Sequence, residues 1–253
     1  REDARVARAS PRNGTARCEP GGLADDVHVR DIRADIARGH IAAAQHVWGT
    51  PTLAGRRVGI AGVGKVGRLL TAHLLDDGAD VVVTDVSPAA THSLTQRFPQ
   101  VEVAPDAVTL CAMAIDVYSP CALGGALDPA TVESLQARIV CGGANNQLAV
   151  DGPDGTADRL QERGILYAPD FLVNAGGVIQ VSDELSGFDF ERAKARTAGI
   201  FEATARVLHT AAERGLTPAA AADQLAEERM ASAAQRGLRL RDGTGSAAPP
   251  FTL

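Results

Sequence analysis

Residues 62–67 read Gly-Val-Gly-Lys-Val-Gly, and this G-x-G-x-x-G spacing is the pattern in the chain most suited to chemistry. A short apolar run at 58–61 precedes it, and apolar residues at helical spacing follow as far as Asp76. A second apolar run, 81–83, ends at Asp85. Strand, glycine turn, helix, strand and acid stand in the order of a dinucleotide-binding βαβ unit.

Each residue type in the turn predicts a different contact. Gly62 permits a tight turn, Gly64 lets the backbone approach a pyrophosphate, and Gly67 lets the helix pack closely on the strand. Lys65 and Val66 belong to the first helical turn, whose unpaired N–H groups and positive dipole end favour phosphate. We expect the Lys65 side chain itself to lie in solvent.

Asp85 follows the glycine turn at the distance expected of a carboxylate that accepts hydrogen bonds from the adenosine ribose. A 2′-phosphate would meet the same negative charge, and residues 86–88, Val-Ser-Pro, offer no arginine to compensate. The sequence therefore favours NAD over NADP as cofactor.

Composition sets the broad class. Of the 253 residues, 45% are hydrophobic and 22% charged, which is typical of a globular protein. The net charge of −6 gives no reason to expect a nucleic-acid or membrane partner, and no apolar run approaches a membrane span. Without a signal-peptide pattern, we expect a cytoplasmic protein. The cysteines lack the spacing of a metal or redox site, so no metal site is expected; they are Cys18, Cys111, Cys121 and Cys141.

The chain reads as one α/β unit with a doubly wound, Rossmann-type parallel sheet. We expect an irregular or mobile N-terminal arm at 1–36, a dinucleotide-binding domain with C-terminal helices at 37–240, and a tail at 241–253. The expected strands after Asp85 are 101–103, 114–118, 138–141 and 165–167. The expected helices are 36–49, 88–98, 131–136, 154–163, 191–214 and 219–235.

Loops rich in glycine and asparagine follow these strands, at 119–125, 142–147 and 174–177. Because the carboxyl ends of parallel strands share one edge, the loops should meet the glycine turn there. In the helix 191–214, we expect Thr204 to lie on the apolar face with its hydroxyl bonded back to the helix.

Several stretches together resemble the glutamate/leucine/phenylalanine/valine dehydrogenase family, and its leucine and valine dehydrogenase branch most closely. They span about residues 36–230 and read AAAQHVWGTPTLAGRRVGIAGVGKVG, VVVTDV, SPCALGGAL, NNQLA, YAPDFLVNAGGVIQVSDEL and AADQLAEERM. The resemblance implies a substrate domain followed by an NAD-binding domain. It also implies interconversion of an L-amino acid and its 2-oxo acid with release of ammonia, the nicotinamide carrying the hydride.

The resemblance assigns roles to individual residues. It implies that the adenosine and pyrophosphate are held by Gly62, Gly64, Gly67 and Asp85. Residues 119–123, among them Cys121 and Ala122, and Asn145-Asn146 would line the nicotinamide half. Asn174 would lie near both the cofactor and the reacting amino acid, with Val178 and Val181 lining the side-chain pocket.

The residues alone also allow simpler interpretations of three of these positions. Val178 and Val181 would then be helix core, and Asn174 would cap a turn. Cys121 and Cys141 are expected to be packing positions rather than nucleophiles.

The family's catalytic lysines and aspartate come from the substrate domain. Only about 35 residues precede the helix at Ile36, none of them lysine, and the chain's two lysines are Lys65 and Lys194. We therefore expect the substrate domain to be largely missing and assign no catalytic residue.

The expected function is the NAD-binding domain of an enzyme that deaminates branched-chain L-amino acids such as leucine or valine, impaired when alone. The alternatives are a non-catalytic NAD-binding protein or truncated product, and a repurposed NAD-dependent oxidoreductase acting on another imine or ketone. We also expect an apolar patch on the helices around 200–208 and 219–230, and with it a homo-oligomer.

Overall fold

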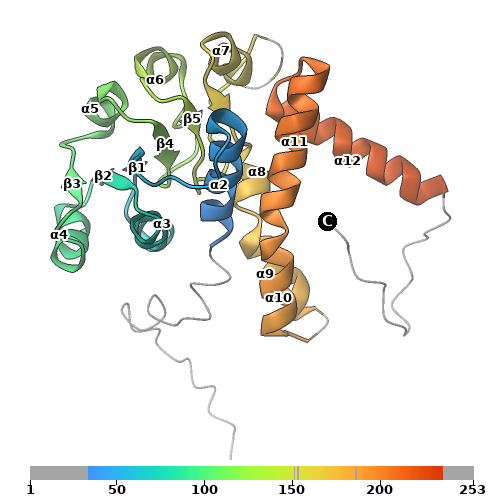
Figure 1. Cartoon of the computed structure of the whole chain (residues 1–253), viewed down its shortest axis with the longest axis horizontal. Helices are drawn as coiled ribbons and strands as arrows, with labels where there is room; N and C mark the ends of the chain where they lie inside the picture. Colours follow the sequence, from blue (N-terminus) through green and yellow to red (C-terminus); the bar gives the residue numbers. More distant parts are fainter. Residues whose placement is uncertain (1–33, 151, 153, 186, 236–253) are drawn as a thin grey trace, which may run out of the picture.

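The computed structural model describes residues 34–150, 152, 154–185 and 187–235. Its centre is a parallel six-stranded sheet in the order β3-β2-β1-β4-β5-β6 (Figure 1). The strands are β1 (Arg57–Ala61), β2 (Asp80–Thr84), β3 (Glu102–Val103), β4 (Val117–Pro120), β5 (Ile139–Val140) and β6 (Leu166–Tyr167). The strand order reverses direction between β1 and β4, where ligands of doubly wound sheets bind. The predicted fold class is confirmed.

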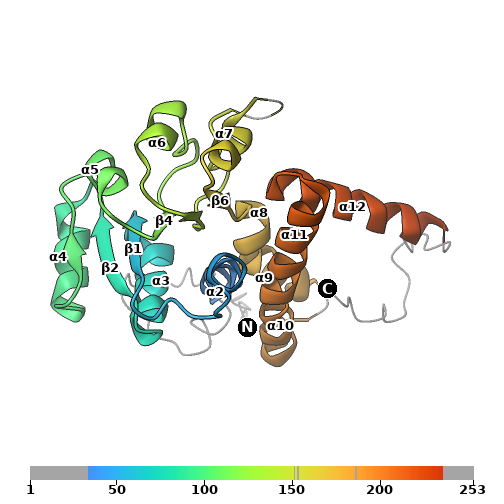
Figure 2. The ribbon, with the colours of Figure 1, turned by 45° about the horizontal axis from the view of Figure 1, so that its top comes forward.

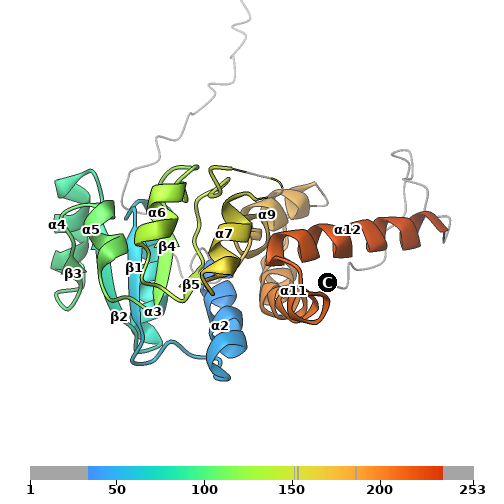
Figure 3. The same ribbon diagram turned by 90° about the horizontal axis from the view of Figure 1, so that it is seen from above.

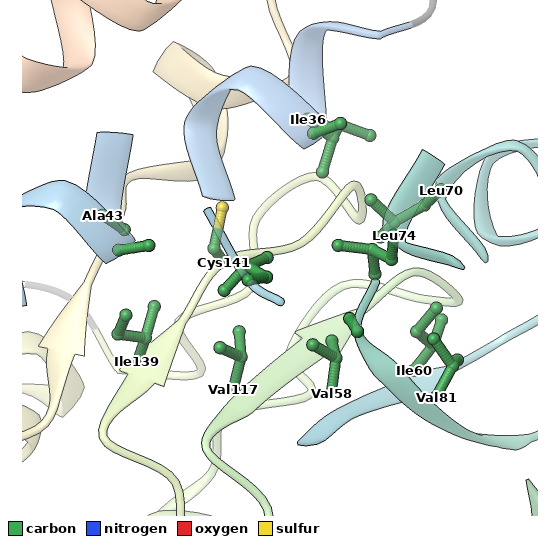
Figure 4. Packing of buried hydrophobic residues seen from close by; sticks show 14 of the residues in the cluster. Ile36, Ala43, Val58, Ile60, Leu70, Leu74, Val81, Val117, Ile139 and Cys141 are labelled. Atoms are coloured by element: carbon green, nitrogen blue, oxygen red, sulfur yellow. The ribbon is translucent and has the colours of Figure 1, made fainter. Parts of the chain in front are cut away.

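Helices cover both faces of the sheet. One face carries α2 (Asp35–Trp48), α3 (Lys65–Asp76) and α4 (Pro88–Arg97); the other carries α5 (Ala107–Ala112), α6 (Pro129–Ser134) and α7 (Thr156–Glu162). Each face of the sheet has its own hydrophobic core, and successive strand residues point into one core and then the other. Val81 and Val83 face α2–α4, whereas Val82 faces α5–α7. Figure 4 shows the first core, where Ile36, Leu70 and Leu74 of the helices lie over Val58, Ile60, Val81, Val117 and Ile139 of the strands.

The remaining helices lie beyond β6. They are α8 (Asp170–Val173), α9 (Gly176–Glu184), α10 (Phe190–Ala198), α11 (Ile200–Arg214) and α12 (Pro218–Gln235). Helix α11 packs along α2, and α12 projects away from the sheet (Figures 2 and 3). None of the helices in the described ranges has both the length and the apolar character needed to cross a membrane.

The largest differences from the predicted elements are at strand β4, at the turn 174–177 and in the helix 191–214. Strand β4 continues through Ser119 and Pro120, which stay in register with Ile60 and Ala61 of β1, so the following loop begins later than expected. The expected turn at 174–177 contains the start of α9, because the carboxylate of Asp35 accepts from the Gly176 N–H at 2.9 Å and satisfies that helix end.

The expected single helix 191–214 is divided at Gly199 into α10 and α11. Thr204 is buried on the inner side of α11 as expected, but its hydroxyl has no hydrogen-bond partner within the described residues. The short helices α5 and α8 were not predicted.

The domain boundaries remain predictions. Helix α2 begins at Asp35, inside the expected arm 1–36, and the rest of that arm lies outside the described residues, as does the tail 241–253.

Candidate functional site

The glycine turn joins the carboxyl end of β1 to the start of α3, as predicted. Gly62 has φ +103°, a conformation that favours glycine, and a β-carbon there would lie 2.8 Å from the backbone nitrogen of Ala122. A β-carbon on Gly67 would lie 1.9 Å from the carbonyl oxygen of Gly62. The fold itself therefore requires glycine at both positions.

Gly64 is different. It is exposed at the N-terminus of α3, and a β-carbon there would meet nothing within 4 Å. The packing of the described chain does not explain glycine at this position. A pyrophosphate seated on the first N–H groups of α3 would explain it, because a β-carbon would occupy the space that the phosphate needs. The turn thus fits a dinucleotide. Lys65 is exposed, as expected, and Val66 is half-buried.

Asp85 lies just beyond the carboxyl end of β2, beside the glycine turn. Its carboxylate accepts from the N–H of Val63 at 2.7 Å and from the N–H of Ser87 at 2.8 Å. It therefore ties the turn to the loop before α4. A carboxylate has about four lone-pair sites, so two more hydrogen bonds from a ribose diol remain available.

The loops after β4, β5 and β6 meet the glycine turn at one edge of the sheet. Ala122 lies against Gly62, and the Gly125 N–H donates to the carbonyl oxygen of Asn146 at 2.7 Å. The side-chain amide of Asn174 donates to the Gly143 carbonyl oxygen at 3.0 Å and to Asn145 Oδ1 at 2.8 Å. The predicted convergence of the loops is present.

Asn174 uses both of its amide hydrogens in these bonds. Its side chain does not cap the turn at Gly176, because Asp35 accepts from the Gly176 N–H; its backbone is the C-cap of α8. Its Oδ1 has no partner in the part of the chain that the structure describes. That oxygen is the atom left to accept a hydrogen bond from a ligand at this edge.

Ser119 is buried and Cys121 is half-buried. The Ser119 hydroxyl donates to Nε2 of His40 at 2.7 Å, while Nδ1–H of His40 donates to the Ile36 carbonyl oxygen at 2.8 Å. Burial raises the pKa of the Cys121 thiol to about 12 and raises the pKa of Cys141 well above its ordinary value. Both cysteines are neutral at pH 7, in line with the packing roles predicted for them.

Val178 and Val181 lie on one side of α9 and are 72% and 61% exposed. Their interpretation as helix core is therefore wrong. Helix α9 is held by other residues: Asp35 binds its first N–H, and buried Asp183 near its end forms a bidentate ion pair with Arg192 of α10. With these contacts satisfied, the two valines are left facing solvent, beside the loop of Asn174.

The apolar patch expected on 200–208 and 219–230 is wrong for the first of these ranges. Ile200 and Leu208 are buried against the rest of the chain, and Met230 of α12 is exposed. The exposed apolar stripe belongs instead to α9, where Leu185 continues the line of Val178 and Val181.

Sequence reasoning missed Asp170 and His40. Asp170 stands three residues after the end of β6, and an acid just beyond the carboxyl end of a strand was a usable signal. His40 gave no such signal, because its partner Ser119 is 79 residues away and only the tertiary fold brings them together.

The fold and the edge described above define an α/β protein with a doubly wound parallel sheet, a class whose ligands bind at that edge. A family model for glutamate/leucine/phenylalanine/valine dehydrogenase matches residues 87–237, and the chain belongs to this family. The predicted resemblance is thereby confirmed.

The chain is similar to a valine dehydrogenase of Streptomyces albus, with 53% identity over 219 residues covering 86% of this chain and 59% of that protein. A leucine dehydrogenase of Bacillus cereus is 40% identical over 209 residues, covering 82% of this chain and 56% of that protein. The crystal structure of L-tryptophan dehydrogenase from Nostoc punctiforme superposes with a TM-score of 0.76 at 33% identity, covering 80% of this chain and 60% of that one. The chain thus spans less than two thirds of the length of each.

Proposed function

We propose that this chain binds NAD(H) along the carboxyl edge of its sheet, as the nucleotide-binding part of a dehydrogenase for aliphatic L-amino acids. The observation that carries the proposal is the open space at Gly64, because a β-carbon there would meet nothing within 4 Å, at the N-terminus of α3 and next to the Val63 N–H that Asp85 binds. When bound, the nicotinamide accepts a hydride from the α-carbon of the amino acid.

The preference for NAD over NADP rests on Asp85. Its carboxylate is already fixed by Val63 and Ser87 and presents its remaining lone pairs beside the turn. A ribose diol can donate to it, whereas a 2′-phosphate would be repelled.

The substrate preference rests on Asn174 and α9. The free Oδ1 of Asn174 can accept from the α-amino group of a substrate, and exposed Val178 and Val181 can pack against an aliphatic side chain. Burying an apolar side chain of that size contributes about 1.5–3 kcal/mol. The match to valine and leucine dehydrogenases supports this substrate class.

The test compares Gly64→Ala with Gly67→Ala, the same change at two positions of one turn. Gly64→Ala should keep the melting temperature but weaken NADH binding by about tenfold or more. A steric clash or a lost contact that costs about 1.4 kcal/mol of binding free energy raises Kd tenfold. Gly67→Ala should lower the melting temperature, since its β-carbon would lie 1.9 Å from the Gly62 oxygen. Unchanged NADH affinity in a folded Gly64→Ala protein would refute the site.

A further inference from the structure

Asp170 is a buried carboxylate to which the proposed function assigns no role. It is the first residue of α8, just after β6, and is 8% exposed. One carboxylate oxygen accepts from the backbone N–H of Asn146 at 2.5 Å, and the other accepts from the hydroxyl of Tyr167 at 2.9 Å. Both partners are donors, which suits an ionised carboxylate because it can only accept.

The peptide that Asp170 holds lies at the junction of the loops. Asn146 has φ +53°, and its carbonyl oxygen accepts from the Gly125 N–H in the loop after β4. Its neighbour Asn145 accepts at Oδ1 from the side-chain amide of Asn174. Between β5 and α7 the chain at 142–147 forms neither helix nor strand. Side chains hold its conformation: Gln147 within the loop donates to the carbonyl oxygens of Gly142 and Ala144, and Asp170 and Asn174, after β6, bind other parts of it.

We propose that Asp170 is a positioning residue for the nicotinamide half of the cofactor site. It does not touch the cofactor. Its charge fixes the Asn146 peptide, and through it the orientation of the Asn145 amide toward Asn174, before a ligand arrives. This inference rests on the proposed NAD binding and adds the residue that organises the half of the site remote from Gly64.

Asparagine and alanine at position 170 should differ in how strongly they disturb the loop at Asn146. Asparagine is the same size and offers one acceptor oxygen, but it lacks the charge. Its NH2 group would face either the Asn146 N–H or the Tyr167 hydroxyl, both of which donate to Asp170. The Tyr167 hydroxyl can turn and accept, so Asp170→Asn should weaken the arrangement without abolishing it. Asp170→Ala leaves the Asn146 N–H without an acceptor inside the protein, and the loop should shift to reach water.

The experiment titrates each protein with NADH and with ADP-ribose, which lacks the nicotinamide, by calorimetry. ADP-ribose reports on the glycine turn and Asp85 alone and shows whether the domain is folded. The readout is the Kd for ADP-ribose divided by the Kd for NADH. We expect this ratio to fall about tenfold or more in Asp170→Ala and less in Asp170→Asn, with ADP-ribose affinity unchanged within about twofold. The control Tyr167→Phe, which keeps the bond to Asn146, should change the ratio by less than about threefold.

Each other result overturns the inference. An unchanged ratio in Asp170→Ala, or in Asp170→Asn should the alanine variant not fold, would show that the carboxylate does not position the nicotinamide loops. Equal losses of affinity for ADP-ribose and NADH would show that Asp170 stabilises the whole fold and not the nicotinamide half in particular. If the unmodified chain binds ADP-ribose but binds NADH no more tightly, the inference fails while the adenosine half of the proposed function stands. Binding of neither ligand would refute the proposed function itself.

Discussion

At the scale of single residues, Asp85 should set the choice of cofactor. In Asp85→Asn the repulsion toward a 2′-phosphate is removed, so the ratio of the NADPH to the NADH dissociation constant should fall toward one. Fluorescence titration with both cofactors measures it. Asp106→Asn is the matched control, because Asp106 loses the same charge and also accepts from a backbone N–H, that of Thr109, at the start of α5. Equal affinities for the two cofactors in the unmodified protein would contradict the role of Asp85.

The residues that could be predicted are those whose role follows from their spacing along the sequence. The spacing of Gly62, Gly64 and Gly67 predicted the glycine turn. The apolar run that ends before Asp85 predicted the position of the acid. Asp170 could not be assigned a partner, because the N–H that it accepts from belongs to a residue 24 positions earlier in the chain. For the valines of α9, helical periodicity indicates an apolar face but does not tell whether the chain covers it.

At the scale of elements, α2 is joined to the sheet by a buried histidine. Burial lowers the pKa of His40 from its ordinary value of 6.5 to about 4, and Ser119 of β4 donates to its bare nitrogen. In the unfolded chain the imidazole takes up a proton as the pH falls below about 6.5, whereas in the folded chain it stays neutral until about pH 4. The contribution of neutral His40 to the free energy of unfolding is therefore fully present above about pH 6.5, and it is lost as the pH falls from there to about 4.

The expected loss is up to roughly 3 kcal/mol in the free energy of unfolding, at about 1.4 kcal/mol for each pKa unit. Urea unfolding from pH 7.5 to pH 4 measures it. His40→Gln keeps an oxygen that can accept from Ser119 but cannot titrate, so the difference between the two proteins isolates the histidine. If both lose stability with the same slope, His40 is not the titrating group.

The elements were predictable where apolar runs and turn residues agree. Strands β1 and β2 lie where apolar runs end at Gly62 and Asp85, and the other four strands overlap the expected ranges, although β3, β5 and β6 are shorter than expected. The errors have tertiary causes. Ser119 and Pro120 extend β4 because β1 beside it is long enough to pair with them, and Asp35 of α2 starts α9 at Gly176. Neither partner is close in sequence.

At the scale of the whole molecule, the described residues form the edge proposed for the cofactor and one side of the proposed substrate position. Asn174 supplies an acceptor and α9 supplies an apolar face. The two lysines of the sequence are Lys65, in the first turn of α3, and Lys194 of α10, whose ammonium lies 5.7 Å from the centroid of the Phe190 ring. The roles proposed above for the described residues are binding roles.

A protein made of these 253 residues should accordingly bind NADH yet oxidise branched-chain amino acids slowly. Deamination passes through a carbinolamine, whose formation and collapse require proton transfer at the α-carbon, and loss of one general acid–base group typically costs about 10²–10⁴-fold in rate. Loss of the group that fixes the substrate carboxylate adds a further cost in positioning. NADH formation from L-valine and L-leucine at alkaline pH, with a full-length family member as control, measures the effect. Turnover within about tenfold of that control is too small a loss for one missing acid–base group and would contradict the prediction. It would show that residues of this chain, or of a second copy, complete the chemistry at the edge formed by Asn174 and α9.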